Sequence, residues 1–573
     1  MKKRGIIASL FLEKRKDMKK KLISWILILQ MIFLVGCGNV SADKAAERKV
    51  NTQGIQDNYR TFYEVFVYSF YDSDGDGIGD IKGLTSKLDY INDGDDSTDS
   101  DLGFSGIWLM PVMPSTTYHK YDVMDYYDID EEYGTLDDFK DFLAECDNRN
   151  ISVILDLVMN HTSSKHPWFL EACDYLKNLD GKEPDENECK YFGYYNFSKK
   201  KLSGVYYPVE GTDWYYEGKF WSEMPDLNLA NENVRQEFTD ICKFWLGMGV
   251  DGFRLDAAKE YVSDNVSANC EILSWFNQMV KEQKEDAYIV AEVWTDMDTY
   301  ARYYESGIDS VFNFAFAGND GIIAKVVKGG NDSYTAKAYG KAVEKCNASF
   351  AAYNENYIDA PFYTNHDMGR SAGYYSGEYS ENQTKIAASM NLFMSGNAFV
   401  YYGEELGMKG SGADEKKRAA MLWSLDKNSE GMCKGPEGAD SVKMKYDSLE
   451  EQSQNSDSIY AYYKKALKIR NSYPEIVKGK TELVEEISDE RICGLLKTYE
   501  EQGEGAETAG KKEVLVISNI SDRSAQVDLS RITLNEREIN SKSLKESLLT
   551  GEDEAALEEA VLSMPAYSVV ILE

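Results

Sequence analysis

The sequence is poor in basic residues, and it lacks the paired cysteines of metal-binding modules. Lysine and arginine number 63 against 98 aspartates and glutamates, which gives a net charge of −35. A surface of this sign repels phosphate backbones and argues against a nucleic-acid-binding protein. The nine cysteines include no CxxC pair, which argues against a structural zinc site. Internal repeats and long runs of like charge are absent too, so neither a repeat protein nor an acidic scaffold is indicated.

The N-terminus carries a short apolar run. Basic residues precede this run at 22–35, and Gly-Cys follows it. The pattern is typical of a signal peptide, and LVGC at 34–37 resembles a bacterial lipobox. We therefore expect a lipoprotein signal peptide over 1–36, a lipidated Cys37, a flexible tether over 37–58, and a membrane-anchored protein at the cell surface.

Three alternatives remain open for this region and its compartment. An uncleaved transmembrane anchor would share the apolar run, although the run is short for a span. The reading frame could begin at Met1 or at Met18. The other eight cysteines could pair in an oxidising compartment or remain free.

From about residue 59 to 475, β-rich runs alternate with amphipathic helical segments. The helical segment 231–249 opens with an Asn cap and closes on Gly. Eight strands with intervening helices predict an α/β fold, a parallel (β/α)8 TIM barrel. The predicted strands are 61–70, 103–112, 151–158, 249–256, 287–294, 308–314, 360–365 and 397–403.

Two further domains are predicted from the spacing and the change of pattern. The interval between the third and fourth strands is too long for one helix, so residues 162–230 are expected to form an inserted subdomain. After residue 475 the runs alternate in polarity, as in KEVLVISNI, which predicts a smaller antiparallel β domain over 476–573. The barrel then occupies 59–475, and the low-complexity stretch EEQGEGAETAGKKE is expected to be a hairpin loop.

Ionisable residues gather at the carboxyl ends of the predicted strands. Active sites of such barrels are built at that end. The chain has only 4 histidines, and two of them belong to this set. Several ionisable clusters on one rim therefore indicate an active site. The residues are Asp156 and His161 on the third strand and its loop, Arg254 and Asp256 on the fourth, Glu292 on the fifth, and His366 and Asp367 after the seventh.

Three carboxylates on one rim suit the cleavage of a glycosidic bond. That reaction needs a nucleophile or base together with a proton donor. Arg254 precedes Asp256 by two residues, so both side chains point to one face of the strand. A cationic neighbour favours an ionised carboxylate, whereas a less polar pocket raises the pKa of a second carboxyl so that it can donate a proton. We interpret the buried arginine as the group that keeps a nucleophilic carboxylate charged.

Four of these segments resemble the signature regions of glycoside hydrolase family 13, the α-amylase family. The resemblance runs from about residue 59 to the end and also includes HKYD, MPDLN and FVYYGEELGM. It implies a catalytic (β/α)8 barrel, a domain B inserted after the third strand, and a C-terminal antiparallel β-sandwich. The four segments are DLVMNH at 156–161, GFRLDAAK at 252–259, AEVW at 291–294 and TNHD at 364–367.

The resemblance also implies roles for individual residues. Asp256 would be the nucleophile that forms a covalent glycosyl-enzyme, and Glu292 the general acid/base. Asp367 would bind sugar hydroxyls and stabilise the transition state. The mechanism would be retaining, with the two carboxyls about 5–5.5 Å apart. The implied substrate-binding residues are Tyr121, His161, Arg254, Lys259 and His366.

Neighbouring positions are less constrained by the resemblance. Asp156 is interpreted as a carboxylate that supports the site. Lys120 stands where the family often has glycine in HGYD, which places the local turn in question. His119 and Trp294 either contact substrate or pack.

The segment DSDGDGIGD at 72–80 alternates aspartates with glycines. Hard oxygen ligands in a tight loop suit calcium, and the pattern is not that of an EF-hand. Relatives in the family bind calcium through the same loop. The expected ligands are Asp72, Asp74, Asp76, Asp80 and the Ile78 carbonyl. A second family calcium site is placed in doubt by Glu260, and Asn160 is expected instead to hydrogen-bond the domain B backbone.

MPDLN at 224–228 resembles the intermediary group of the family, which includes lipid-anchored α-amylases. We therefore expect a monomeric α-amylase that acts on α-1,4-glucan and maltooligosaccharides. An α-glucosidase, a neopullulanase or a 4-α-glucanotransferase would use the same residues. A non-catalytic glucan-binding or transporter-associated relative is a further alternative, against which the complete set of carboxylates argues.

Overall fold

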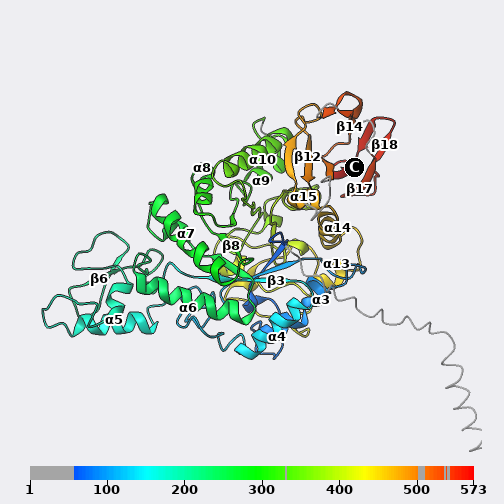
Figure 1. Ribbon diagram of the computed structural model, residues 1–573. Coiled ribbons are helices and arrows are strands. Elements are labelled where there is room, and N and C mark those ends of the chain that lie inside the picture. The colour runs from blue at the N-terminus through cyan, green and yellow to red at the C-terminus, as the bar shows by residue number, and fades with distance from the viewer. Residues whose placement is uncertain (1–56, 330–331, 501–509, 535–536, 539–542) are drawn as a thin grey trace, which may run out of the picture. The chain divides into compact units, whose positions relative to one another are not determined.

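The computed structural model describes residues 57–573, apart from 330–331, 501–509, 535–536 and 539–542 (Figure 1). The expected signal peptide over 1–36, the lipidation residue Cys37 and all but the last two residues of the tether lie outside the described residues. Within the described part of the chain, no helix is both long and apolar enough to cross a membrane.

A seven-stranded parallel sheet, in the order β10-β1-β2-β3-β7-β8-β9, forms the centre of the fold. Two isolated parallel bridges, Phe312 to Ala360 and Phe362 to Phe399, link the β9 edge to the β10 edge. The (β/α)8 barrel is therefore confirmed. Its strands are β1 (Phe62–Val65), β2 (Gly106–Leu109), β3 (Ser152–Leu157), β7 (Gly252–Leu255), β8 (Tyr288–Ala291), β9 (Ser310–Val311) and β10 (Phe399–Tyr401).

The expected strand at 360–365 is reduced to these two bridges. Pro361 has no N–H to donate to a ladder, so continuous pairing stops there. The other strands are shorter than their apolar runs, because parallel strands buried on both faces merge into equally apolar loops. After Val65, for example, the chain enters the 3-10 helix η1 (Val67–Ser69).

Helices follow the strands, and their ends carry the expected signals. In α6 (Glu232–Met248), the Asn231 side chain accepts a hydrogen bond from the Asn233 N–H, and Gly249 ends the helix at a φ of 119°. The longer helices are α4 (Leu136–Asp147), α6, α7 (Val266–Gln283), α9 (Ile322–Lys328), α10 (Ala336–Ala351), α11 (Ser380–Leu392) and α14 (Ile459–Ser472). Shorter ones are α2 (Ile81–Ser86), α3 (Leu88–Ile91), α8 (Met297–Tyr300), α12 (Asp414–Lys417), α13 (Leu449–Gln452) and α15 (Pro474–Lys478).

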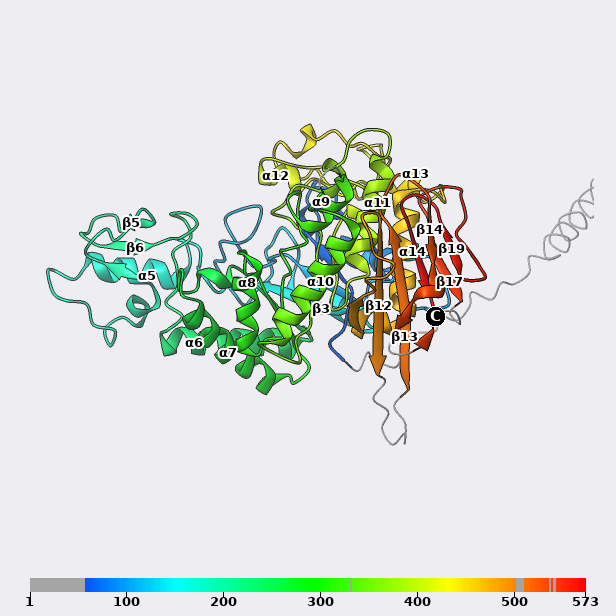
Figure 2. The same ribbon diagram turned by 90° about the horizontal axis from the view of Figure 1, so that it is seen from above.

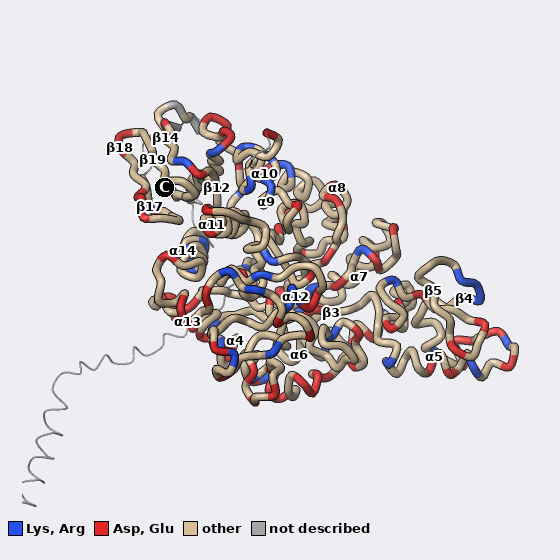
Figure 3. Tube along the Cα trace, turned by 180° about the vertical axis from the view of Figure 1, so that it is seen from behind, with Lys and Arg blue, Asp and Glu red and all other residues tan. Residues whose placement is uncertain are grey.

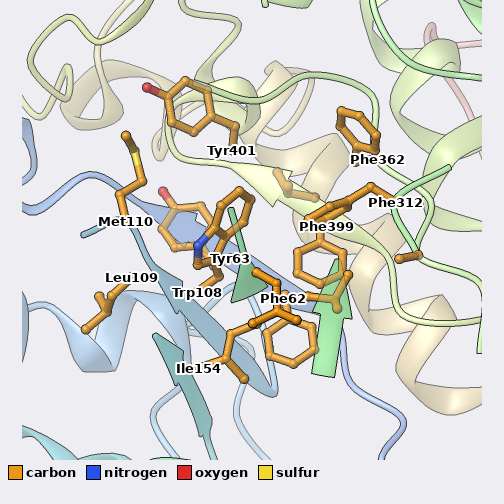
Figure 4. Packing of buried hydrophobic residues seen from close by; sticks show 14 of the residues in the cluster. Phe62, Tyr63, Trp108, Leu109, Met110, Ile154, Phe312, Phe362, Phe399 and Tyr401 are labelled. Carbon is orange, nitrogen blue, oxygen red and sulfur yellow. The ribbon is translucent and has the colours of Figure 1, made fainter. Parts of the chain in front are cut away.

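Aromatic side chains fill the inside of the barrel (Figure 4). The Phe62 ring stacks on Phe399 at 4.7 Å between centroids and on Tyr288 at 5.3 Å. Trp108 lies 5.4 Å from Phe312. These rings close the interior below the catalytic rim, so polar side chains at the strand ends sit on an apolar floor.

Residues 162–230 hold a small three-stranded sheet and a helix. The sheet has the order β4-β6-β5, and Phe169 of α5 packs against Tyr216 of β6 at 4.8 Å. The segment connects to the barrel through a bridge between His161 and Asp226. Its elements are α5 (Pro167–Lys177), η2 (Lys190–Tyr194), β4 (Phe197–Ser198), β5 (Tyr206–Pro208) and β6 (Tyr215–Glu217).

Antiparallel sheets make up the C-terminal region (Figure 2). The larger sheet has the order β11-β12-β13-β20-β17, and a second has the order β14-β19-β18. Long strands β12 and β13 pair from Ile492 opposite Asn519 to Glu500 opposite Lys511. The strands are β11 (Lys480–Leu483), β12 (Ile492–Glu500), β13 (Lys511–Asn519), β14 (Ala525–Asp528), β15 (Thr533–Leu534), β16 (Arg537–Glu538), β17 (Leu544–Leu548), β18 (Ala556–Glu558), β19 (Val561–Met564) and β20 (Ser568–Leu572).

Acidic and basic residues are interspersed along the chain (Figure 3). Among the described residues, all eight cysteines are free, and six of them are buried. The choice between paired and free thiols that the sequence leaves open is thus decided for these eight positions.

Candidate active site

Arg254 of β7 joins three carboxylates at the carboxyl end of the barrel. Its Nη1 lies 2.8 Å from Asp156 Oδ1 and 2.6 Å from Asp256 Oδ1, and its Nη2 lies 2.9 Å from Glu292 Oε2. Asp156 is directly opposite Arg254 in the β3–β7 pairing. The guanidinium is completely buried, so these carboxylates provide the charge that such a group requires.

The environment of Glu292 favours a protonated carboxyl. Its Oε2 accepts a hydrogen bond of 3.0 Å from the Ala257 N–H, and its side chain is largely buried. Burial raises the pKa of Glu292, and the charges of Asp256 and Asp367 add to this rise against the effect of Arg254. A carboxyl of this kind can donate a proton near neutral pH.

Asp367 has the opposite environment. Its Oδ2 lies 3.1 Å from His366 Nε2, and its Oδ1 lies 2.8 Å from Arg418 Nη2. Burial acts to raise the pKa of Asp367, but His366, Arg418 and Arg254 outweigh it and hold the pKa well below its usual range. Asp367 is therefore held as an ionised acceptor, whereas the surroundings of Glu292 shift its pKa in the opposite direction, so the site combines two carboxyl environments.

Tyr121 and His366 lie beside these carboxylates. The Tyr121 hydroxyl is 2.9 Å from Asp156 Oδ2 and 2.8 Å from His366 Nε2, and the two rings stack at 5.6 Å. His366 Nδ1 lies 2.6 Å from Glu64 Oε1. Asp156 thus fixes both Arg254 and Tyr121, which agrees with the supporting role expected for it.

His161 presents a polar atom that no described residue satisfies. Its Nε2 is buried without a hydrogen-bond partner in the described part of the chain. Burial lowers the pKa of His161, so the ring is neutral near pH 7. A buried unpaired nitrogen is costly, and a sugar hydroxyl is a suitable partner for it.

Lys259 is not drawn into the charged cluster. It belongs to the 3-10 helix η3 (Ala258–Glu260), and its nearest ion-pair partner is Glu260 at 3.5 Å. The side chain remains about one-third exposed, at 34%. An ammonium that is one-third exposed at the rim can still reach a ligand that extends beyond the carboxylates.

His119 and Trp294 occupy different environments. His119 is largely enclosed, with Nδ1 3.0 Å from Thr117 Oγ1. The Trp294 side chain is 49% exposed and stacks on Phe314 at 5.2 Å. Trp294 and Phe314 also line a cavity of about 860 Å³ that reaches Asp367. The geometry favours packing for His119 and ligand contact for Trp294.

The turn at Lys120 is formed without glycine. Lys120 adopts a φ of 62°, in the left-handed region that glycine tolerates best. Its buried ammonium lies 2.9 Å from Asp130 and also faces Glu132 and the Tyr133 ring. Lys120 therefore forms the turn in place of glycine, and its buried ion pair with Asp130 stabilises the left-handed backbone conformation.

Two residues at the site were missed at the sequence level. Arg418 contacts Asp367 directly, and its Nε also donates to the His366 carbonyl at 3.2 Å. Glu64 contacts His366 from β1. Glu64 is a charge inside an apolar strand, the same signal that marks Arg254. Arg418 gives no such signal, because it follows the charged run DEKK.

The aspartate loop brings three of its expected ligands together. Carboxylate oxygens of Asp72, Asp74 and Asp80 lie within 4.8 Å of one another. The Asp76 carboxylate is not in this group and instead accepts the Ile78 N–H at 2.7 Å. An all-oxygen set fits a calcium ion, which Asp72, Asp74 and Asp80 would hold. Such an ion would tie the loop to α2 and would take no part in bond cleavage.

The surroundings of Asn160 differ from the expectation. Its side-chain nitrogen donates a hydrogen bond to the Asp226 carboxylate at 3.2 Å. Its main-chain carbonyl accepts a hydrogen bond from the Leu227 N–H. Glu260 pairs with Lys219 at 2.9 Å. The expected link to the backbone of the inserted segment is therefore made by the main chain of Asn160 and not by its amide.

Comparisons with known proteins agree with this geometry. The family model for the α-amylase catalytic domain matches residues 64–479. Alpha-amylase 3 of Dictyoglomus thermophilum is 38% identical over 451 residues, which cover 75% of this chain and 83% of that protein. The solved structure of Eubacterium rectale Amy13B has a TM-score of 0.84 at 48% identity and covers 91% of this chain and 96% of its own. An α-amylase structure from H. orenii has a TM-score of 0.75 at 35% identity, covering 90% and 99%. The chain therefore belongs to the α-amylase family, glycoside hydrolase family 13.

Proposed function

We propose that this protein is an α-amylase that hydrolyses α-1,4-glucosidic bonds in starch and maltooligosaccharides. The observation that carries the proposal is the contact of one buried guanidinium, Arg254, with Asp256 and Glu292. Family membership narrows the substrate to a glucan-like acetal. The relatives named as α-amylases are the reason to prefer this activity over others in the family.

In the proposed first step, the Asp256 carboxylate attacks the anomeric carbon and forms an ester with the sugar. The Glu292 carboxyl gives its proton to the glycosidic oxygen as the bond to carbon breaks, and the leaving chain departs with a new hydroxyl. The raised pKa of Glu292 supports its role as the donor.

In the second step, the Glu292 carboxylate removes a proton from water, whose oxygen attacks the anomeric carbon. The ester bond breaks, Asp256 regains its charge, and the product keeps the α configuration. Asp367 remains ionised throughout and binds sugar hydroxyls, with Tyr121, His161 and His366 around the same ring and Lys259 toward the leaving chain. The ionised state of Asp367 is supported by its two cationic neighbours, His366 and Arg418.

An α-glucosidase, a neopullulanase or a 4-α-glucanotransferase would use the same steps with a different acceptor or chain position. The exposed Trp294 beside the large cavity favours a substrate that extends beyond one glucose. A non-catalytic glucan-binding relative would have no need of the paired carboxyl states at Glu292 and Asp367.

We propose further that the protein is a lipoprotein of the intermediary MPDLN group, anchored through Cys37 at the cell surface after removal of 1–36. The lipobox-like LVGC and the MPDLN motif support this. We also propose domain B over 162–230, a barrel over 59–475, a β-sandwich over 476–573 and calcium in the aspartate loop. A palmitate-labelling experiment on Cys37→Ala tests the anchor, since the label should be lost.

A time course of products tests the activity. The purified protein would be incubated with amylose, maltoheptaose and pullulan, and the products separated by size and anomeric form. An α-amylase gives a rapid fall in chain length with α-configured maltose and maltotriose. Release of glucose alone, or products longer than the starting oligosaccharide, would replace this assignment with an α-glucosidase or a glucanotransferase.

A further inference from the structure

Glu64 is a buried carboxylate in the first barrel strand that no step above uses. It is 1% exposed and lies on β1 opposite Trp108 of β2 and Tyr401 of β10. Side chains alternate along a strand, so Glu64 shares the inward face with Phe62. It therefore projects into the barrel two residues beyond Phe62, in the same row as Trp108.

Among the described residues, the Glu64 carboxylate hydrogen-bonds one side chain, that of His366. Glu64 Oε1 lies 2.6 Å from His366 Nδ1 and also accepts the His366 backbone N–H at 3.3 Å. On the other side of the ring, Nε2 lies 3.1 Å from Asp367 Oδ2 and 2.8 Å from the Tyr121 hydroxyl. Both ring nitrogens thus face oxygen acceptors, and two of these acceptors are carboxylates.

We propose that Glu64 is a positioning residue that holds His366 as a doubly hydrogen-bonded imidazolium, with its Nε2–H directed at Asp367 and the sugar. A neutral imidazole has a single N–H and would leave one of the two carboxylates facing a lone pair. The imidazolium has an N–H for each side. Its charge also balances part of the negative charge that Asp156, Asp256 and Asp367 bring to the rim.

The groups packed around His366 act in both directions. Burial opposes the cation, whereas Asp367 and Glu64 favour it. The Arg254 guanidinium lies on the far side of Tyr121, with Nη1 3.5 Å from the Tyr121 hydroxyl. Asp156 faces the ring through Tyr121, and Trp108 meets it edge-on at 5.7 Å. The net effect raises the pKa of His366 to about 9.

The other three histidines of the chain behave differently. Burial lowers the pKa of His119 to about 4, that of His166 to about 3, and that of His161 in the same direction. Near pH 7.5 the inference therefore predicts one imidazolium among four histidines. This contrast allows a direct observation on the unmodified protein.

The first experiment is histidine-selective 15N NMR on the purified protein, with the His366→Asn variant to assign the signal. We expect three neutral rings at pH 7.5 and one ring with both nitrogens protonated, which is the signal lost in His366→Asn. A neutral His366 at this pH overturns the proposal. The readout needs no activity, so it stands apart from the proposed α-amylase function.

The second experiment is Glu64→Gln, with Glu405→Gln as the matched control. Glu405 is equally buried but bonds the hydroxyls of Tyr63 and Tyr90 on the outer face of the barrel. We expect Glu64→Gln to lower kcat/KM by about 10- to 100-fold, as loss of a charged hydrogen bond does. Glu64→Gln should also turn His366 neutral by NMR at pH 7.5, whereas Glu405→Gln should leave that signal unchanged.

A double-mutant cycle separates a positioning role from a merely structural one. If Glu64 acts through His366, adding Glu64→Gln to His366→Asn should change kcat/KM by no more than about twofold. A further loss equal to that of the single variant contradicts the proposal. Glu64→Asp retains the charge and should keep the imidazolium signal even where it lowers the rate; loss of that signal in Glu64→Asp counts against it too.

Discussion

A guanidinium presents its N–H groups in a fixed plane, and Arg254 uses this shape to serve several carboxylates at once. Asp156 anchors it from the neighbouring strand, and Asp256 and Glu292 take its other contacts. The arrangement fixes the two reacting carboxyls relative to each other without a direct bond between them. At the scale of single residues, the proposed catalysis therefore depends on the ion pairs between Arg254 and the carboxylates around it.

Replacement of the proposed nucleophile tests that dependence. Asp256→Asn keeps the shape of the side chain but cannot form the ester, so hydrolysis should fall by about a thousandfold or more. Asp251→Asn, at the amino end of the same strand, is the matched control, because Asp251 bonds Lys284 and the Val153 N–H away from the rim. The hydrolysis rate of each variant would be measured with maltoheptaose. Full activity in Asp256→Asn would contradict the assignment of Asp256 as the nucleophile.

Arg418 gives a prediction about pH. Arg418 helps to hold the pKa of Asp367 low, so Arg418→Gln should raise that pKa. Because Asp367 must be ionised to bind sugar hydroxyls, activity should disappear at a higher pH on the acid side of the profile. The kcat/KM profile should thus shift its acid limb upward by about one unit or more. Lys416→Gln on α12 is the control, and an acid limb that stays in place would refute the role of Arg418.

What the sequence reveals at this scale depends on local contrast. Arg254 and Glu64 are both charges inside apolar strands, and this contrast identifies a buried, paired group from sequence alone. Arg418 follows four charged residues on a short helix, where the ordinary expectation is a solvated side chain. Its contact with Asp367 joins positions 51 residues apart and is formed only by the fold.

At the scale of elements, the strand ends determine where functional groups occur, and the loops determine what they can reach. The seventh strand is lost as a ladder, yet His366 and Asp367 still arrive at the rim, because two bridges suffice to hold 360–365 in the barrel wall. Strand position could be predicted from apolar runs. Strand length could not, because the loops are equally buried.

Calcium bound in the aspartate loop should stabilise the folded protein. If Asp72, Asp74 and Asp80 hold the ion, EDTA should lower Tm and added Ca²⁺ should restore it, since a ligand that binds only the folded state stabilises it. Asp72→Asn should abolish this dependence. Asp76→Asn should retain it, because Asp76 lies outside the carboxylate group. A Tm that is insensitive to EDTA in the native protein would exclude a calcium site of useful affinity.

The loop after β8 should affect how well the protein binds long substrates. Trp294 is half exposed, backed by Phe314, and borders the cavity that reaches Asp367. Trp294→Ala should raise the KM for maltoheptaose by about three- to tenfold, the loss of one stacking contact, with little change for a short maltoside. Tyr353→Ala removes a ring of comparable exposure, 41% against 49%, outside this cavity and serves as control. Equal effects on long and short substrates would place Trp294 outside the binding path.

At the scale of the whole molecule, the order of the elements was predictable from the alternation of runs. A parallel barrel, an insertion after its third strand and antiparallel sheets at the end follow from spacing and periodicity. The ion pairs between residues far apart in the sequence could not be predicted in this way. Lys120 with Asp130, and Lys219 with Glu260, are chosen by the packed structure, because sequence carries no measure of which distant charges meet.

The cysteines give a prediction for the molecule as a whole. Seven of the eight described thiols show a raised pKa, with burial as the leading cause, as for Cys173, Cys346 and Cys493, each at about 12. Few of these thiols are thiolates at neutral pH, so they should react slowly with a thiol reagent until the protein unfolds. Cys189, partly exposed, should react first, and Cys189→Ser should remove that fast phase.

Because none of the described cysteines is bonded to another, reductant should leave Tm unchanged. A disulfide would contribute about 2–5 kcal/mol, and its reduction would lower Tm by several degrees. The two measurements check each other. A drop in Tm with dithiothreitol, together with fewer than eight titratable thiols after unfolding, would show a covalent cross-link. Unchanged Tm with all eight of these thiols recovered, Cys37 being counted separately, would show that no disulfide is needed to hold the barrel and the C-terminal sheets together.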